Sequence, residues 1–258
     1  MKILVCIKQV PDTDDIKWTE NNTMQRDGVE SIMNPCDLYA IKEALRIKRE
    51  RENTKISVLT MGPSQAQNVL KQAISLGCDD GFLLSDKKFA GADTYATGKT
   101  IASAIQEKLN DFDLILCGQY AIDGDTAQTG PSIASQLNIP QVTFVKNLER
   151  CDGKSIYAVR ELEDGLEKVN VELPALICIL KDSEEPPRAT INGIRKANNT
   201  DIITYSIEDI NLSPEAAGIK GSPTYVSKAF RPEHNRGECT YCQTYASLAA
   251  KIKEYINE

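Results

Sequence analysis

Short apolar runs alternate with longer amphipathic segments along the first 140 residues of this chain. The apolar runs lie at residues 2–7, 55–61, 81–84 and 114–117. Between them, apolar side chains recur every three or four residues at 35–47, 66–74 and 95–109, which is helical periodicity. Strands that alternate with helices in this way build α/β folds. The sequence therefore predicts a doubly wound, mostly parallel sheet.

The pattern changes from about residue 143 onward. Short strand-like runs at 143–145, 155–159 and 167–171, with Asp-Gly turns between them, predict an antiparallel ribbon. Another buried strand is expected at 175–180. We therefore expect one nucleotide-binding domain over residues 1–185 and an extended C-terminal arm over 186–258. An amphipathic stretch at 245–256 suits an arm that grips a partner subunit, and docking back on the same chain is equally compatible.

A polar, glycine-punctuated segment follows the buried run at 114–117 and precedes a helix-like stretch at 132–137. In parallel sheets, ligands bind at the carboxyl ends of the strands, where helix N-termini offer free N–H groups to phosphate. The segment therefore predicts a nucleotide site, and the alternative is an ordinary solvated turn. Its candidate residues are Gly118, Gln119, Tyr120, Ala121, Ile122, Asp123, Gly124, Asp125, Thr126, Ala127, Gln128 and Thr129.

Composition excludes several classes of protein. The net charge of −7 gives no electrostatic reason to expect nucleic acid as a partner. No run approaches the ~18 apolar residues of a membrane span, so membrane insertion is not expected. The first residues form a strand-like run at once instead of a signal peptide. A soluble cytoplasmic protein is the expectation.

Cysteine and histidine usage argues against metal sites and hydrolytic catalysis. Six of the eight cysteines are scattered singly, and without a secretion signal a disulfide framework is not expected. Cys239 and Cys242 form a CxxC pair near His234, the one histidine of the chain. A structural zinc site takes four ligands, so packing at a helix start is favoured over a metal or redox role for this pair. We expect no metal site.

Phosphate-binding motifs of the best-known kinds are absent from the sequence. There is no GxGxxG, and Gly98-Lys99-Thr100 lacks the earlier glycine of a P-loop, because Asp93 stands in that position. We therefore expect residues 98–100 to lie inside a helix.

Several motifs in sequence order resemble the beta subunit of electron transfer flavoprotein along nearly the whole chain. They are VCIKQVPD at 5–12, NPCD at 34–37, MGP at 61–63 and AID at 121–123. The most specific resemblance is AVRELEDGLEKV at 158–169, followed by LPALIC at 173–178. The resemblance implies a Rossmann-like α/β domain that pairs with an alpha subunit and relays electrons through flavin. It implies an electron-transfer subunit with no substrate chemistry, so catalytic residues of its own are not expected.

Members of this family differ in the nucleotide that the beta subunit holds. Simple carriers hold AMP, whereas electron-bifurcating members hold a second FAD that exchanges a hydride with NAD(H). Gly124, Thr126 and Ala127, together with residues 91–97, look like the bifurcating form. We therefore expect FAD and NAD(H), with electrons passed to ferredoxin and to a flavin-dependent dehydrogenase of the acyl-CoA or 2-hydroxy acid type. The alternatives are the AMP-holding carrier and, from another class, a nucleotide-binding module of the universal-stress type.

The resemblance also carries individual residues. Besides residues 118–129, the nucleotide is expected to contact Cys6, Asn34, Cys36, Asp37 and Met61. Whether Cys6 or Cys36 tunes the flavin or merely packs stays open.

A second flavin adds a phosphate. Gly124 would let the backbone approach it closely, and Thr94 would offer its hydroxyl and N–H. Asp93 is either a further cofactor contact or only a helix N-cap.

Residues 189–196 resemble the family's recognition loop, in which Ile191 would contact a partner dehydrogenase; the alternative is an ordinary loop hydrophobe. In the family, leucine is common at the position of Ile191 and proline is common at the position of Asn192.

Overall fold

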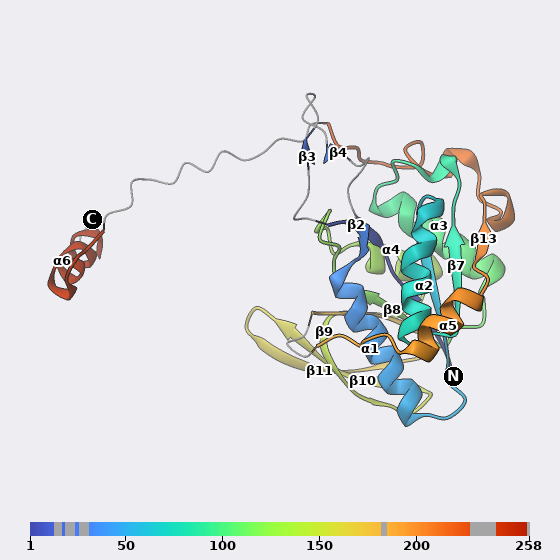
Figure 1. Cartoon of the computed structure of the whole chain (residues 1–258), viewed down its shortest axis with the longest axis horizontal. Coiled ribbons are helices and arrows are strands. Elements are labelled where there is room, and N and C mark those ends of the chain that lie inside the picture. Colours follow the sequence, from blue (N-terminus) through green and yellow to red (C-terminus); the bar gives the residue numbers. More distant parts are fainter. Residues whose placement is uncertain (13–16, 19–23, 26–30, 182–184, 228–240, 257–258) are drawn as a thin grey trace.

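The computed structural model describes residues 1–12, 17–18, 24–25, 31–181, 185–227 and 241–256 (Figure 1). Its centre is a nine-stranded sheet with the order β11-β10-β9-β12-β8-β1-β6-β7-β13. The middle of the sheet is parallel and consists of β1 (Lys2–Cys6), β6 (Lys55–Met61), β7 (Asp80–Leu84), β8 (Leu114–Gly118) and β12 (Ala175–Ile179). This architecture confirms the expected α/β class with a doubly wound, mostly parallel sheet.

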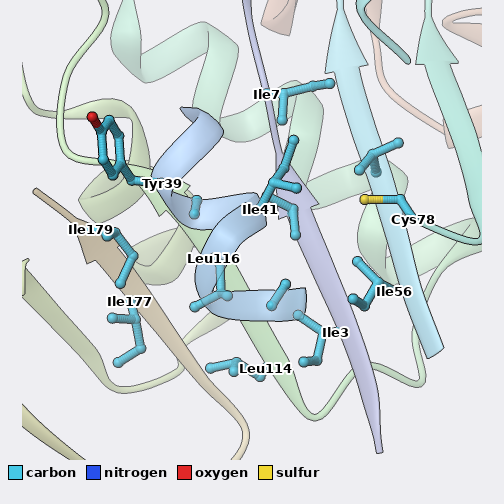
Figure 2. Close-up of a cluster of buried hydrophobic side chains, with 14 of the residues drawn as sticks. Ile3, Ile7, Tyr39, Ile41, Ile56, Cys78, Leu114, Leu116, Ile177 and Ile179 are labelled. Carbon is cyan, nitrogen blue, oxygen red and sulfur yellow. The ribbon is translucent and has the colours of Figure 1, made fainter. Parts of the chain in front are cut away.

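Helices cover both faces of the sheet and enclose two apolar cores. On one face lie α1 (Pro35–Glu50) and α2 (Gln67–Leu76), and on the other lie α3 (Thr94–Lys108) and α4 (Thr129–Leu137). Figure 2 shows Tyr39 and Ile41 of α1 lying over Ile3, Leu116 and Ile177 from three strands of the sheet. Ile41 is fully buried, and burial of such a side chain contributes about 1.5–3 kcal/mol.

Local sequence signals explain where these helices begin and end. Pro35 occupies the first turn of α1, where its missing N–H costs nothing. α2 ends at Gly77, which adopts a φ of 128° that glycine tolerates best. The Asp93 carboxylate accepts a hydrogen bond from the Ala96 N–H and so caps α3. As expected, residues 98–100 lie within α3.

The antiparallel ribbon is formed by β9 (Gln141–Cys151), β10 (Ser155–Leu162) and β11 (Gly165–Glu172). It continues the main sheet because β9 also pairs in parallel with β12. Smaller pairs join β2 (Gln9–Pro11) to β5 (Ser31–Met33) and β3 (Lys17–Trp18) to β4 (Met24–Gln25). Short 3-10 turns lie at Ser64–Ala66, Lys87–Phe89, Glu208–Ile210 and Pro214–Ala216.

The region after residue 185 contains more regular structure than the sequence pattern predicts. It forms α5 (Ile191–Asn199), β13 (Ile203–Tyr205), which pairs with β7, and α6 (Tyr245–Ile256). Of these, only α6 was expected. The expected recognition loop at 189–196 is wrong as a loop, because Thr190 caps a helix that begins at Ile191. Ile207, Ile210 and Ala217 join the second core, and the domain division at residue 185 stays a prediction.

A glycine sets the packing of α5 on α2. A Cβ at Gly193 would overlap the Ser75 carbonyl oxygen and lie 3.0 Å from the Ser75 carbonyl carbon. We expect Gly193→Ala to displace α5 and to lower the free energy of unfolding by about 1–3 kcal/mol, the usual cost of overpacking. Thermal unfolding measures this change. Asn192→Ala, at the exposed neighbouring position, is the control, and equal losses in the two variants would contradict the packing argument.

Helices in the described part of the chain are all too short or too polar to cross a membrane.

Candidate nucleotide-binding site

The candidate site lies where the strand order of the sheet reverses. From β1 the chain builds β6 and β7 on one side and then crosses to β8 on the other, so β1 and β8 are neighbours at the switch point. Ligands of open α/β sheets bind in the crevice at the carboxyl ends of such strands. Here these ends carry Cys6 and Gly118, two of the residues expected to contact a nucleotide.

A buried carboxylate connects the two strand ends. Asp37, in the first turn of α1, accepts a hydrogen bond from the Lys8 N–H at 2.7 Å and another from the Gly118 backbone. α1 approaches β8 so closely that a Cβ on Gly118 would overlap Asp37 Oδ1 and lie 2.8 Å from the Cys36 carbonyl carbon. Glycine at position 118 is therefore a requirement of this contact.

Asn34 extends the same network to the polar loop. Its Nδ2 donates to Asp37 Oδ1 at 3.0 Å and to the Tyr120 carbonyl at 2.9 Å, while its Oδ1 accepts from the Ile122 N–H at 3.2 Å. Its own backbone N–H donates to the Lys8 carbonyl at 2.9 Å. Asn34 is almost fully buried, so these bonds satisfy an amide that would otherwise be costly to bury. The loop is thus held by side chains 80 or more positions earlier in the chain.

Lys8 contributes to the site although the sequence analysis did not single it out. Its Nζ donates to both carboxylate oxygens of Asp123, at 2.7 and 2.8 Å. The lysine side chain is half exposed, so the ion pair adds at most about 1 kcal/mol. The signal for Lys8 is its place two residues after the end of a buried strand, because the candidate site lies at the carboxyl ends of the parallel strands.

Burial changes the acid–base properties of this network. It raises the pKa of Asp37 to about 7, against the lowering effect of the hydrogen bonds from Asn34, Lys8 and Gly118. Burial and the neighbouring Asp37 also raise the pKa of the Cys36 thiol. This direction favours the protonated form of the Cys36 thiol at neutral pH.

Three cysteines lie side by side beneath the crevice. Cys6, Cys117 and Cys178 occupy matching positions on β1, β8 and β12. Hydrogen bonds with the other two thiols, together with burial, raise the pKa of Cys117. These thiols form a packing layer, and the described cysteines are all free of disulfides.

The distal half of the loop has a backbone suited to an anion. Asp125 and Ala127 have φ values of 47° and 54°, in the left-handed region that non-glycine residues rarely adopt. Gln128 follows Ala127 in the right-handed region, and such a pair of left- and right-handed residues is typical of backbone concavities that bind anions. No side chain among the described residues caps the first turn of α4, so the N–H groups of Thr129 and Gly130 remain available to a phosphate, whereas Pro131 has no N–H. A Cβ on Gly124 would meet nothing within 4 Å, so that position borders open space.

Close contacts fix α4 at this position. A Cβ on Gly130 would overlap Cys178 Sγ, which shows how closely α4 approaches β12. A Cβ on Gly98 of α3 would lie 2.7 Å from Ser132 Cβ of α4. The two helices therefore begin next to one another at the same edge of the sheet.

The structure thus connects some of the predicted site residues directly and leaves others apart. Hydrogen bonds and backbone contact join Asn34, Cys36 and Asp37 to the loop at 118–122. Half-buried Cys6 and Met61 end neighbouring strands, while Asp93 and Thr94 lie at the start of α3. Ile191 is 75 % exposed on α5, whose helix packs against α2 and not against the loop.

Gln119 was predicted as a site residue, and the structure adds a feature that the sequence did not show. Its Oε1 accepts a hydrogen bond from the Phe144 N–H at 2.5 Å, while its buried Nε2 has no partner among the described residues. An unpaired buried amide beside the crevice fits a site whose polar groups are completed by a ligand.

Comparison with known proteins decides the family. A model of the electron transfer flavoprotein domain matches residues 21–210. The chain belongs to the electron transfer flavoprotein family. It is 44 % identical to the caffeyl-CoA reductase-Etf complex subunit CarD of Acetobacterium woodii, over 98 % of each chain. It is also 44 % identical to the electron transfer flavoprotein subunit beta of Thermoanaerobacterium thermosaccharolyticum, covering 100 % of this chain and 98 % of the relative. This electron transfer flavoprotein beta subunit is thus similar to its relatives along its whole length.

A third relative is the acryloyl-CoA reductase electron transfer subunit gamma of Anaerotignum propionicum, 41 % identical over 90 % of this chain and 89 % of the relative. The family assignment removes the support for a universal-stress-type module.

The structure describes one of the two cysteines of the CxxC pair. Cys239 and His234 lie outside the described residues, whereas Cys242 is a free, half-buried cysteine. Within the described part of the chain, no cluster of three or more potential ligands is arranged to hold a metal ion.

Proposed function

We propose that this electron transfer flavoprotein beta subunit binds FAD and works in flavin-based electron bifurcation or confurcation. The observation that carries the proposal is the loop at 118–129, with its left-handed residues, open Gly124 and uncapped α4 N-terminus. These features fit a nucleotide phosphate that is bound by backbone N–H groups.

In this proposal each part of the site has its own task. Residues 124–129 and the first turn of α4 hold the phosphates, whereas Asn34 and Asp37 keep the loop in the shape that does so. Cys6, Cys36 and Met61 contribute apolar surface to the crevice. When bound, the flavin supplies the redox chemistry, which is hydride exchange with NAD(H) and onward electron transfer. The chain itself binds, orients and sets the surroundings of the cofactor.

The proposed partners are an alpha subunit, a flavin-dependent dehydrogenase and, indirectly, ferredoxin. The names of two relatives refer to caffeyl-CoA and acryloyl-CoA reductases, which supports an acyl-CoA type of dehydrogenase over a 2-hydroxy acid type. α6 suits the alpha subunit because its apolar side chains Leu248, Ile252 and Ile256 are 46 %, 49 % and 76 % exposed.

Counting nucleotides in the purified complex tests the proposal. The chain is produced with its alpha subunit, and the nucleotides released by denaturation are measured per heterodimer. We expect two FAD and no AMP, together with oxidation of NADH. One FAD and one AMP would overturn the proposal.

One observation favours the AMP-holding carrier as a second candidate. The Asp93 carboxylate accepts from the Ala96 N–H at 2.9 Å, so it already uses a donor of the α3 first turn. With that donor used, α3 has fewer N–H groups to offer a second phosphate, which suits a site for a single phosphate. The same nucleotide count distinguishes this candidate.

Exposed Ile191 gives a prediction about the partner dehydrogenase. An exposed aliphatic side chain at a helix start is suited to fill a small pocket. We expect Ile191→Ala to raise the KM for the dehydrogenase about 10-fold and to leave nucleotide content unchanged. Leu166→Ala, at a 63 % exposed position on the ribbon, is the control. An unchanged KM in Ile191→Ala would contradict a recognition role.

A further inference from the structure

The segment before α3 is bound tightly to residues 217–224, which lie more than 120 positions later in the chain. The Ile219 N–H donates to the Ala90 carbonyl at 3.1 Å. Gly218 has a φ of 55°, and a Cβ there would overlap the Lys88 carbonyl oxygen and lie 2.9 Å from that of Ala90. The two segments therefore pack backbone against backbone.

Asp93 is the centre of this contact. Its Oδ2 accepts hydrogen bonds from the Thr224 N–H at 3.0 Å and from the Thr224 hydroxyl at 2.7 Å. Its own N–H donates at 2.8 Å to the Ser222 hydroxyl, which in turn donates to the Gly218 carbonyl at 2.8 Å. We call Asp93, Ser222 and Thr224 the clasp. Burial alone would raise the pKa of Asp93, but the hydrogen bonds from Ala96 and Thr224 outweigh it and lower this pKa.

The clasp lies at the start of α3, the helix that packs against α4. α3 and α4 begin at the same edge of the sheet and touch where Gly98 meets Ser132. Asp93 uses one carboxylate oxygen for the helix cap and the other for Thr224, so the chain segment at 222–224 fixes the side chain that caps α3. The position of Thr94, the first residue of α3, therefore depends on a part of the chain outside the α/β core.

We propose that the clasp is a specificity determinant of the nucleotide site, through which residues 222–224 favour FAD over AMP. The inference rests on the proposed function and on the expectation that Thr94 adds its hydroxyl and N–H to the second phosphate, which FAD has and AMP lacks. The clasp residues are positioning residues, because they act through the placement of α3. Loss of the clasp therefore weakens binding of FAD and leaves binding of AMP to the loop and α4 unchanged.

Competition between the two nucleotides tests the inference. In the assembled complex, with the alpha subunit carrying its own FAD, AMP displaces FAD from the beta site, and flavin fluorescence reports the ratio of the two affinities. We expect Thr224→Val to shift this ratio about 10-fold toward AMP, the effect of losing one well-placed hydrogen bond to a charged group. AMP affinity itself should change by less than about 2-fold.

Two further variants separate the clasp from the helix cap. Asp93→Asn keeps a cap acceptor for Ala96 but loses the carboxylate oxygen that Thr224 uses, so it should behave like Thr224→Val. Thr200→Val is the matched control, because the Thr200 hydroxyl donates to the Lys196 carbonyl at 2.8 Å on α5, away from the clasp. It should leave the ratio unchanged.

The outcomes distinguish the inference from the proposed function. A wild-type complex that binds AMP but no FAD at the beta site overturns the proposed function and the inference with it. A wild-type complex that binds FAD, with Thr224→Val lowering FAD and AMP affinity by the same factor or changing neither, overturns the inference alone.

Discussion

Gly118→Ala is expected to unfold the nucleotide site and to lower the stability of the whole chain. The added Cβ would overlap Asp37 Oδ1 and lie 2.8 and 2.9 Å from backbone atoms of Cys36 and Asp37. Backbone cannot move aside as a flexible side chain can, so α1 must shift away from β8. We expect a loss of about 3 kcal/mol or more in the free energy of unfolding, and a fall in the melting temperature of roughly 6–12 °C.

Gly124→Ala is the matched control for this variant. A Cβ at that position meets nothing within 4 Å, so stability should change by less than about 0.5 kcal/mol. Thermal unfolding of the nucleotide-free chain compares the two variants. Equal stability of Gly118→Ala and the wild type would show that α1 adjusts without cost, and it would contradict the close contact described above.

Asp37→Asn is expected to have the second largest effect. The carboxylate accepts hydrogen bonds from the backbone of Lys8 and Gly118 and from Asn34. An asparagine has one acceptor oxygen, so its NH₂ group would face a buried N–H donor. Leaving buried donors unsatisfied costs about 1–3 kcal/mol each, and we expect a loss of about 3 kcal/mol together with weaker nucleotide binding.

The difference in stability between the wild type and Asp37→Asn depends on pH because the pKa of Asp37 is raised. Burial raises the pKa of Asp37 from 3.8 to about 7, so the folded chain holds this proton more tightly than the unfolded chain. The stability contributed by Asp37 is therefore full below pH 4 and declines as the pH rises to about 7.

We expect the gap in stability between wild type and Asp37→Asn to be wider at pH 5 than at pH 8 in urea unfolding. Asp164→Asn, at an exposed turn, is the comparison variant. A gap that widens with pH would contradict the raised pKa.

Secondary structure was predictable where the signal is local. The strands at 2–7, 55–61 and 114–117 and the helix that begins at Pro35 were expected from apolar periodicity and from proline at the first turn. α5 was missed because its sequence, INGIRKANN, has a glycine in its first turn and few apolar residues. It is a helix because Thr190 caps it and because Gly193 lets it approach α2, and only the second of these depends on distant residues.

The candidate site was predictable as a set of residues but not as a network. The Gly118–Thr129 loop and Asn34 were identified from their motifs. Nothing in those motifs shows that Asn34 bonds Tyr120 and Ile122, or that Lys8 bonds both Asp37 and Asp123. Such pairs depend on which strand ends are neighbours, and that is decided by the order of strands in the sheet.

The class of fold, the family and the position of the candidate nucleotide loop followed from the amino-acid pattern, because periodicity and motifs are read within short windows of the chain. The contacts by which Asp37 joins β1 to β8 and Asp93 joins α3 to Thr224 depend on the folded arrangement. These contacts bridge 29 to 131 positions along the chain. They form because parallel strands bring their carboxyl ends to one edge, where segments distant in sequence share a crevice and must satisfy one another's buried polar groups.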